Sequence, residues 1–106
     1  MEDLVFDTEN CPIARVSKII QGKWTMVIMY LLSENTLRFS EIKRKLPSVT
    51  EASLTKDLRL LESYGVINRQ VYPVVPPKVE YSLTEMGKAF LPILNLLNEW
   101  ADKYTT

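Results

Sequence analysis

The fold of this protein is decided by residues 37–84, which read LRFSEIKRKLPSVTEASLTKDLRLLESYGVINRQVYPVVPPKVEYSLT. Leu37–Phe39 is expected to be short and extended, and the apolar residues that follow recur every three or four positions, which predicts helices. In the second half, apolar and polar residues alternate on both sides of a Pro-rich segment, which predicts two strands joined by a stiff turn. The stretch therefore changes from helical to extended structure near Gly65.

Proline, glycine and capping residues mark where these elements begin and end. Ser40 is expected to cap a basic helix over Glu41–Leu46, which Pro47 stops. Thr50 is expected to cap the next helix, and Gly65 to close it. Two helices joined by a tight turn form a helix-turn-helix, and a hairpin directly after it is a wing. The helix-turn-helix covers about 40–64 and the wing about 66–83, with Val75, Pro76, Pro77 and Lys78 at its tip.

Two helices are expected before this stretch. The first covers about 12–21, with Asn10 as its N-cap and Gly22 as its end. The second runs from about Lys23 to Leu32 and is apolar on most sides, so it should be central and buried. The whole chain, residues 1–106, is thus expected to be one winged helix-turn-helix domain of the α+β class, mainly α.

A long helix is expected after the wing, over about 85–103, with Thr84 as its N-cap. Pro92 lies inside it and should bend it, because proline cannot donate a hydrogen bond to the carbonyl of Lys88. The helix carries more apolar side chains than one core contact can use. The excess predicts a partner for this helix.

The overall charge balance gives a misleading first impression. The 106 residues include 13 Lys and Arg and 13 Asp and Glu, so the formal net charge is zero, whereas nucleic-acid binders usually carry a basic surplus. Residues 1–10 carry four carboxylates, residues 38–46 a net charge of +3, residues 64–78 one of +2, and residues 79–106 one of −2. The middle of the chain is basic and both ends are acidic. An ordinary mixed, solvated surface is the alternative interpretation.

The residue types that are missing exclude several function classes. The chain has no His, so Ser-His-Asp and Cys-His catalysis and imidazole metal sites are ruled out, and we expect no enzyme, no metal and no cofactor. One Cys cannot form an internal disulfide, which favours the cytoplasm. No apolar run approaches the roughly 20 residues of a membrane helix. The acidic start, Met1–Leu4, is unlike a secretory or mitochondrial targeting segment.

The second helix of the helix-turn-helix has an outward face suited to reading DNA. Leu54, Leu58 and Leu61 should point inward, which leaves short and polar side chains outside, and an α-helix fits the major groove. The residues expected to contact bases are Thr50, Glu51, Ala52, Ser53, Thr55 and Lys56. Those expected to contact phosphates are Lys23, Arg38, Lys43, Arg44, Arg59 and Lys78.

Three of these residues have an alternative interpretation. Lys56 and Arg59 also fit an ordinary solvated helix face. Glu51 suits either acceptance of a hydrogen bond from a cytosine amino group or support of the helix dipole. Asp57, in the middle of the same helix, does not help phosphate binding.

Several short motifs along the chain occur together in one known family. They are Cys11-Pro12-Ile13, Gly22-Lys23-Trp24-Thr25, Arg38-Phe39-Ser40-Glu41-Ile42, Leu54-Thr55-Lys56-Asp57-Leu58, Tyr64-Gly65-Val66-Ile67, Val71-Tyr72-Pro73, Val75 to Thr84, and Gly87. In these motifs the chain resembles the HxlR-type regulators, which are bacterial winged helix-turn-helix transcription factors related to the MarR type. The resemblance runs from about Cys11 to Trp100, and the wing is its most specific part.

The resemblance implies a transcriptional regulator, more often a repressor, that binds a palindromic or repeated double-stranded DNA operator as a homodimer. It implies pairing through the first and last helices, about 12–21 and 85–103, and the unused apolar surface of the last helix fits this. The residues expected at the dimer interface are Ile13, Val16, Phe90, Leu94, Leu97, Trp100, Ala101 and Tyr104.

Cys11 occupies a special place within the resemblance. Some HxlR-type members sense electrophiles or oxidants through a Cys just before the first helix, so Cys11 is a candidate redox sensor. The helix N-terminus favours a thiolate, whereas the four preceding carboxylates oppose it, and a silent structural Cys is the alternative. The sequence shows no obvious residues of a small-molecule pocket, and an effector of either kind stays open.

A function from another class also fits the fold. Some winged helices use their helical surface to bind proteins, and the zero net charge is compatible with such an interaction module. The two functions predict different responses to salt, because binding through several phosphates weakens steeply as salt is raised.

Overall fold

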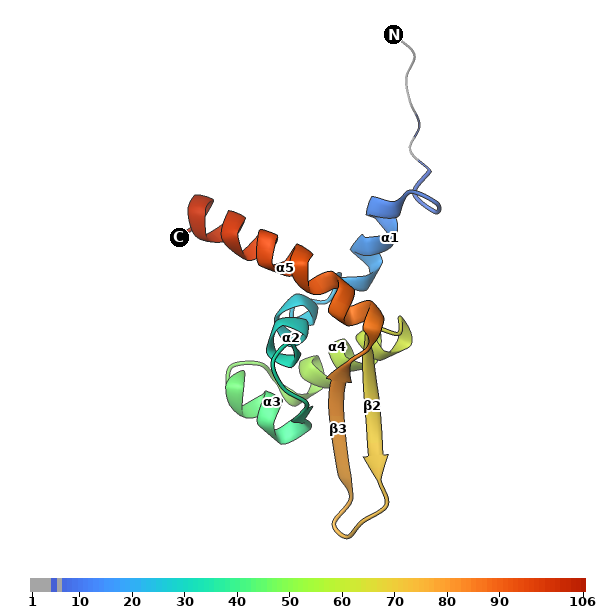
Figure 1. Ribbon diagram of the computed structural model, residues 1–106, viewed down its shortest axis with the longest axis vertical. Helices are drawn as coiled ribbons and strands as arrows, with labels where there is room; N and C mark the ends of the chain where they lie inside the picture. Colours follow the sequence, from blue (N-terminus) through green and yellow to red (C-terminus); the bar gives the residue numbers. More distant parts are fainter. Residues whose placement is uncertain (1–4, 6) are drawn as a thin grey trace.

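The elements follow the order that the sequence predicts. A computed structural model describes residue 5 and residues 7–106, so Glu2 and Asp3 of the acidic start lie outside the described residues. The elements are α1 (Pro12–Ile19), α2 (Thr25–Leu32), β1 (Leu37–Arg38), α3 (Phe39–Lys45), α4 (Glu51–Ser63), β2 (Ile67–Tyr72), β3 (Lys78–Leu83) and α5 (Glu85–Tyr104). Figure 1 shows α3 and α4 beside a long β2–β3 hairpin, which confirms a mainly helical winged helix-turn-helix.

The wing belongs to a small antiparallel sheet in the order β1-β3-β2. Ile67 pairs with Leu83 at the base of the hairpin and Tyr72 with Lys78 near its tip. On the other side of β3, Leu37 pairs with Tyr81. The expected extended segment is therefore confirmed as β1, except that Phe39 already begins α3.

The core lies between the helix-turn-helix, α2 and the base of the sheet. Leu54, Leu58 and Leu61 of α4 are fully or almost fully buried, as their spacing predicts. Ile28 of α2 and Ile42 of α3 are completely buried beside them. The apolar faces of three helices thus meet at one place, and this fixes the direction in which α4 presents its outer face.

Two helix caps differ from the expectation. Asn10 does not cap α1, because its side-chain amide donates to Asp7 Oδ2 at 2.7 Å and lowers the pKa of Asp7, so Cys11 is the N-cap. Ser40 lies inside α3, whose N-cap is Arg38 with its N–H donating to Glu41 Oε1 at 2.9 Å. The side-chain caps of Thr50 and Thr84 are confirmed, since they accept from the amides of the residues three positions later.

The first two helices are also shorter than expected. α1 ends at Ile19 instead of residue 21, and α2 begins at Thr25 instead of Lys23. Residues 20–24 connect the two helices, and α1 lies beside the first half of α5 (Figure 1). α5 runs as one helix through Pro92 to Tyr104, and the bend expected at Pro92 stays a prediction.

Candidate nucleic-acid interface

The recognition helix α4 is held in place from its inner face by Asp57. This residue is 4% exposed, and its Oδ2 accepts a hydrogen bond of 2.8 Å from the backbone N–H of Trp24, at the start of α2. Gly22 lies so close to the carboxylate that any side chain there would overlap Asp57 and Thr25. Asp57 therefore turns its charge toward α2 and away from the outer face that DNA would meet, and Gly22 is required by this close approach.

The outer face of α4 carries the side chains that the sequence assigns to base contact. Five of the six are exposed, and Thr55 is half-buried. Thr50 also serves as the N-cap, because its Oγ1 accepts from the N–H of Ser53 at 3.1 Å. Glu51 is exposed in the first turn, where a carboxylate favours the helix dipole. The first two turns of α4 thus form a continuous accessible surface of short and polar residues.

Three of the expected phosphate contacts gather around α3. Lys43 and Arg44 border a shallow depression that reaches Glu51 at the start of α4, and Arg38 shares a second depression with Arg44. Lys43 is half-buried and donates to the carbonyl of Pro47 at 3.2 Å, which fixes its direction along the turn. These side chains form a cationic edge next to the outer face of α4.

Two other cations that the sequence assigns to phosphates have local partners. Lys78 Nζ lies 3.8 Å from Glu80 Oε2 and 4.9 Å from the centre of the Tyr72 ring. The same Glu80 raises the pKa of Tyr72 through a hydrogen bond and its negative charge. Lys23 is exposed and lies over the ring of Trp24, 5.3 Å from its centre.

Arg69 is a cation at this surface that the sequence analysis did not assign to DNA. It is exposed on β2 and lines a hollow of about 290 Å³ together with Arg59 and Thr55 of α4. Arg59 and Arg69 thus face one space between the recognition helix and the wing. The signal that could have revealed it is the basic character of residues 64–78, in which Arg69 and Lys78 are the only charged residues.

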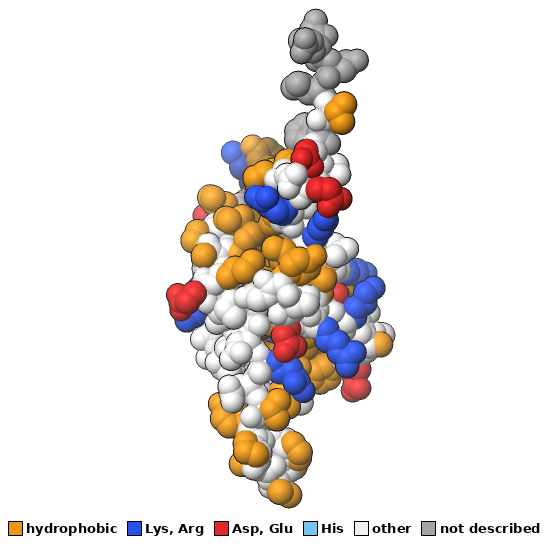
Figure 2. Space-filling model, turned by 90° about the vertical axis from the view of Figure 1, so that its right-hand side faces the viewer, with side chains coloured by type: hydrophobic (Ala, Val, Ile, Leu, Met, Phe, Trp, Pro, Cys, Tyr) orange, Lys and Arg blue, Asp and Glu red, His pale blue; other side chains and the backbone are white. Residues whose placement is uncertain are grey.

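The tip of the wing is apolar instead of cationic. Residues 73–77 contain no Lys or Arg, Val75 is fully exposed, and Lys78 is the first residue of β3 and not part of the turn. Figure 2 shows hydrophobic side chains at the lower end of the molecule and Lys and Arg side chains on the body above it. The cations of the wing, Arg69 and Lys78, therefore lie on its strands and not in the turn at its tip.

The expected dimer residues fall into two groups. Ile13, Leu97, Trp100 and Tyr104 are exposed, and Val16, Phe90 and Ala101 are half-buried. Leu94 differs from the expectation: it is 6% exposed and belongs to the core of its own chain, so it is not available to a partner. The packing of α5 against α2 and β3 turns this position toward the core.

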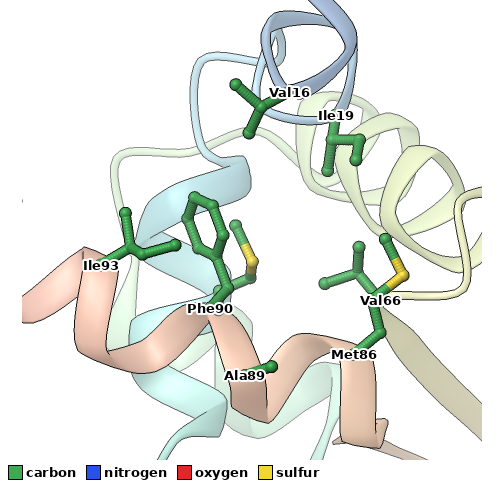
Figure 3. A pocket seen from close by; sticks show the side chains of 8 residues that line it. Val16, Ile19, Val66, Met86, Ala89, Phe90 and Ile93 are labelled. Carbon is green, nitrogen blue, oxygen red and sulfur yellow. The ribbon is translucent and has the colours of Figure 1, made fainter. Parts of the chain in front are cut away.

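The structure also contains a pocket that the sequence did not indicate. An apolar hollow of about 200 Å³ lies between α1 and α5, with Met29 and Val66 at its floor. Figure 3 shows Val16 and Ile19 facing Phe90 and Met86 across it. Cys11, which does not line this hollow, is a half-buried free thiol at the start of α1.

The part of the chain that the structure describes holds neither a cluster of three or more residues suited to a metal ion nor a helix able to span a membrane.

Known proteins with similar sequence and structure share this architecture. The chain is 48% identical over 103 residues to an uncharacterised HTH-type transcriptional regulator of Methanothermobacter thermautotrophicus, covering 97% of this chain and 79% of that one. It matches the redox regulator HypR in its oxidised form with a TM-score of 0.83 and 42% identity, over 91% and 99% of the two chains. It matches the reduced form of the transcriptional regulator YodB from Bacillus subtilis with a TM-score of 0.77 and 32% identity, over 89% and 93%. Residues 19–106 match the HxlR-like helix-turn-helix family, to which this chain therefore belongs.

Proposed function

We propose that this protein is a cytoplasmic transcriptional regulator that binds a double-stranded DNA operator as a homodimer and acts as a repressor. The observation that carries the proposal is the accessible outer face of α4, bordered on one side by the cations of α3 and on the other by Arg69 of β2. The names of the similar proteins support the regulatory role.

In the proposed complex, α4 enters the major groove with its first two turns. Thr50 to Lys56 face the base edges, while the side chains around α3, with Arg59 and Arg69, meet phosphates on the two sides of the groove. The inward position of Asp57 leaves Glu51 as the exposed carboxylate of this first part of α4. Two copies related by a two-fold axis would place their α4 helices about 34–36 Å apart, on successive turns of one DNA face.

The proposal is tested by selecting genomic fragments with the purified protein and measuring their affinity at several salt concentrations. A regulator that contacts several phosphates loses affinity steeply between 50 and 200 mM salt, by roughly 10³-fold if six phosphates are involved. Selection of no particular sequence, or a flat response to salt, would instead support the protein-interaction module.

Substitutions of two lysines separate sequence reading from phosphate contact. Lys56→Ala is expected to weaken operator binding by roughly 1–3 kcal/mol and to relax specificity at one base pair. Lys43→Ala is expected to weaken binding to all sequences and to lower the salt slope by about one. Lys88→Ala, an exposed lysine on α5, serves as the control and should leave binding unchanged. Unchanged binding in both α3 and α4 variants contradicts the proposed surface.

Redox control through Cys11 is a second proposal, favoured by the likeness to a redox regulator and by the position of this thiol at the N-cap of α1. The chain has one Cys, so oxidation by diamide must join its sulfur to a thiol of another molecule. The two thiols lose two electrons and two protons, and diamide takes them up as it is reduced to a hydrazine. We expect diamide to change the operator affinity of the wild type and not that of Cys11→Ala. Equal responses of the two proteins would rule out Cys11 as the sensor.

A further inference from the structure

The outer side of α5 carries a regular apolar stripe that its own domain leaves largely uncovered. Its members are Met86, Phe90, Ile93, Leu97, Trp100 and Tyr104, and all but the half-buried Phe90 are between 44% and 63% exposed. Successive members are four, three, four, three and four residues apart. Such alternation of four and three is the pattern of a helix that packs along a second helix.

The order of these intervals is the same when it is read from either end. The stripe is therefore symmetric about residue 95, and the residue numbers of each symmetric pair add up to 190. If a second α5 lies antiparallel to the first, Met86 comes opposite Tyr104, Phe90 opposite Trp100, and Ile93 opposite Leu97. Every large side chain then has an apolar partner, as a two-fold, self-complementary interface requires.

The hollow between α1 and α5 lies at the position where this register brings in an aromatic ring. Phe90 and Ile93 enter the hollow from α5, and Val16 comes down from α1 (Figure 3). Its volume of about 200 Å³ exceeds that of an apolar cavity of about 150 Å³ that holds benzene. Trp100 is 59% exposed and is the largest side chain of the stripe, and its ring centre lies 5.6 Å from that of Tyr104 on its own helix, with the two rings tilted by 43°.

The exposure of α1 favours an apolar occupant for the hollow. α1 has eight residues, all within the described part of the chain, and none of them is buried. An isolated helix of this length is marginal in water and depends on packing for its stability. Ile19 already packs against the edge of the core, and an apolar group placed in the hollow that Val16 and Ile19 face would add to this packing.

We propose that a second copy of this chain lays its α5 antiparallel along the first, centred on residue 95, and that its Trp100 fills the hollow beneath α1. The proposal rests on the dimer of the proposed function and adds the orientation, the register and the residue that each copy supplies to the other. By symmetry both hollows are filled, so each copy stabilises the α1 of its partner.

Cross-linking of single cysteines tests the orientation. Met86→Cys and Tyr104→Cys are made separately in a Cys11→Ala background, mixed, allowed to exchange and oxidised. The mixture is expected to form a disulfide-linked dimer that neither variant forms alone, because identical residues in the antiparallel pair are 18 positions apart, about 27 Å along the helix. If each variant instead forms a disulfide with a second copy of itself, and no disulfide joins residue 86 to residue 104 in the mixture, the two helices are parallel and the proposal is overturned.

The role of Trp100 is tested by the dimer dissociation constant from analytical ultracentrifugation. Trp100→Ala is expected to raise it roughly 100-fold, since a buried Trp is typically an energetic centre of an interface. Leu96→Ala, an equally exposed residue beside the stripe, should change it only a few-fold. In a Trp24→Phe background, the emission of Trp100 should shift to shorter wavelength as the concentration rises through the dissociation constant.

The outcomes separate this proposal from the function on which it rests. A dimer that binds DNA but is unaffected by Trp100→Ala overturns the register and leaves the dimeric regulator standing. A protein that stays monomeric at all concentrations and still binds operator DNA overturns both the register and the dimer, while DNA recognition by α4 remains.

Discussion

Gly87→Ala is expected to lower the free energy of unfolding by about 3 kcal/mol, although Ala is normally the better residue in a helix by about 1 kcal/mol. A Cβ at this position of α5 would overlap the carbonyl oxygen of Val66. That carbonyl belongs to the backbone and is held in place, because it accepts from the N–H of Thr84 at 3.1 Å and from its hydroxyl at 3.0 Å. The clash cannot be relieved by a small rotation of a side chain.

Thermal unfolding checks this prediction. A loss of this size lowers the Tm of a domain of about 100 residues by roughly 10 °C or more. Asn95→Ala, at an exposed position of the same helix, is the matched control and should be neutral or slightly stabilising. If Gly87→Ala behaves like the control, α5 does not pack against Val66 as the structure has it.

Asp57→Ala is expected to cost about 3 kcal/mol of folding stability, because it removes a charged acceptor and leaves the N–H of Trp24 without its partner. Asp57→Asn keeps an oxygen acceptor and should lose less, about 1 kcal/mol. Glu62→Ala, an exposed acid on the same helix, should change stability little. Urea unfolding of the three variants measures these differences.

The same variants distinguish a structural role of Asp57 from electrostatic repulsion of DNA. If the carboxylate faced DNA, its removal would strengthen operator binding at low salt. Because it faces α2, we expect Asp57→Ala to weaken binding, through loss of the fixed direction of α4, even at temperatures where the protein stays folded. Tighter binding by Asp57→Ala would contradict the inward position.

Local features of the chain were predictable from the sequence. The Leu54, Leu58 and Leu61 stripe, the caps Thr50 and Thr84, and the left-handed Gly65 depend on residues within one or two helical turns of each other, where spacing determines the outcome. Because these features determine the order of the helices and the wing, they determine the fold. The outer face of α4 follows directly, as the side opposite the leucines.

Features that join distant segments were not predictable in this way. Asp57 and Trp24 are 33 residues apart, and Gly22 was interpreted only as the end of a helix. Asp57 nevertheless lies three residues after Leu54 and four before Leu61, so its place on the inner face was implicit in the pattern. Arg38 became a cap because Glu41 reaches its N–H, a contact that competes with the propensity of Ser40. The hollow beneath α1 exists only through the assembly of α1, α2 and α5.

The uncharged tip of the wing has a thermodynamic consequence. Residues 73–77 carry no cation, so their approach to DNA releases no condensed counterions and adds nothing to the slope of affinity against salt. Val74 and Val75 expose apolar surface, and burying it in a groove makes the heat-capacity change of binding more negative. The wing tip and the cations of α3 should therefore be separable by calorimetry, the former through temperature and the latter through ionic strength.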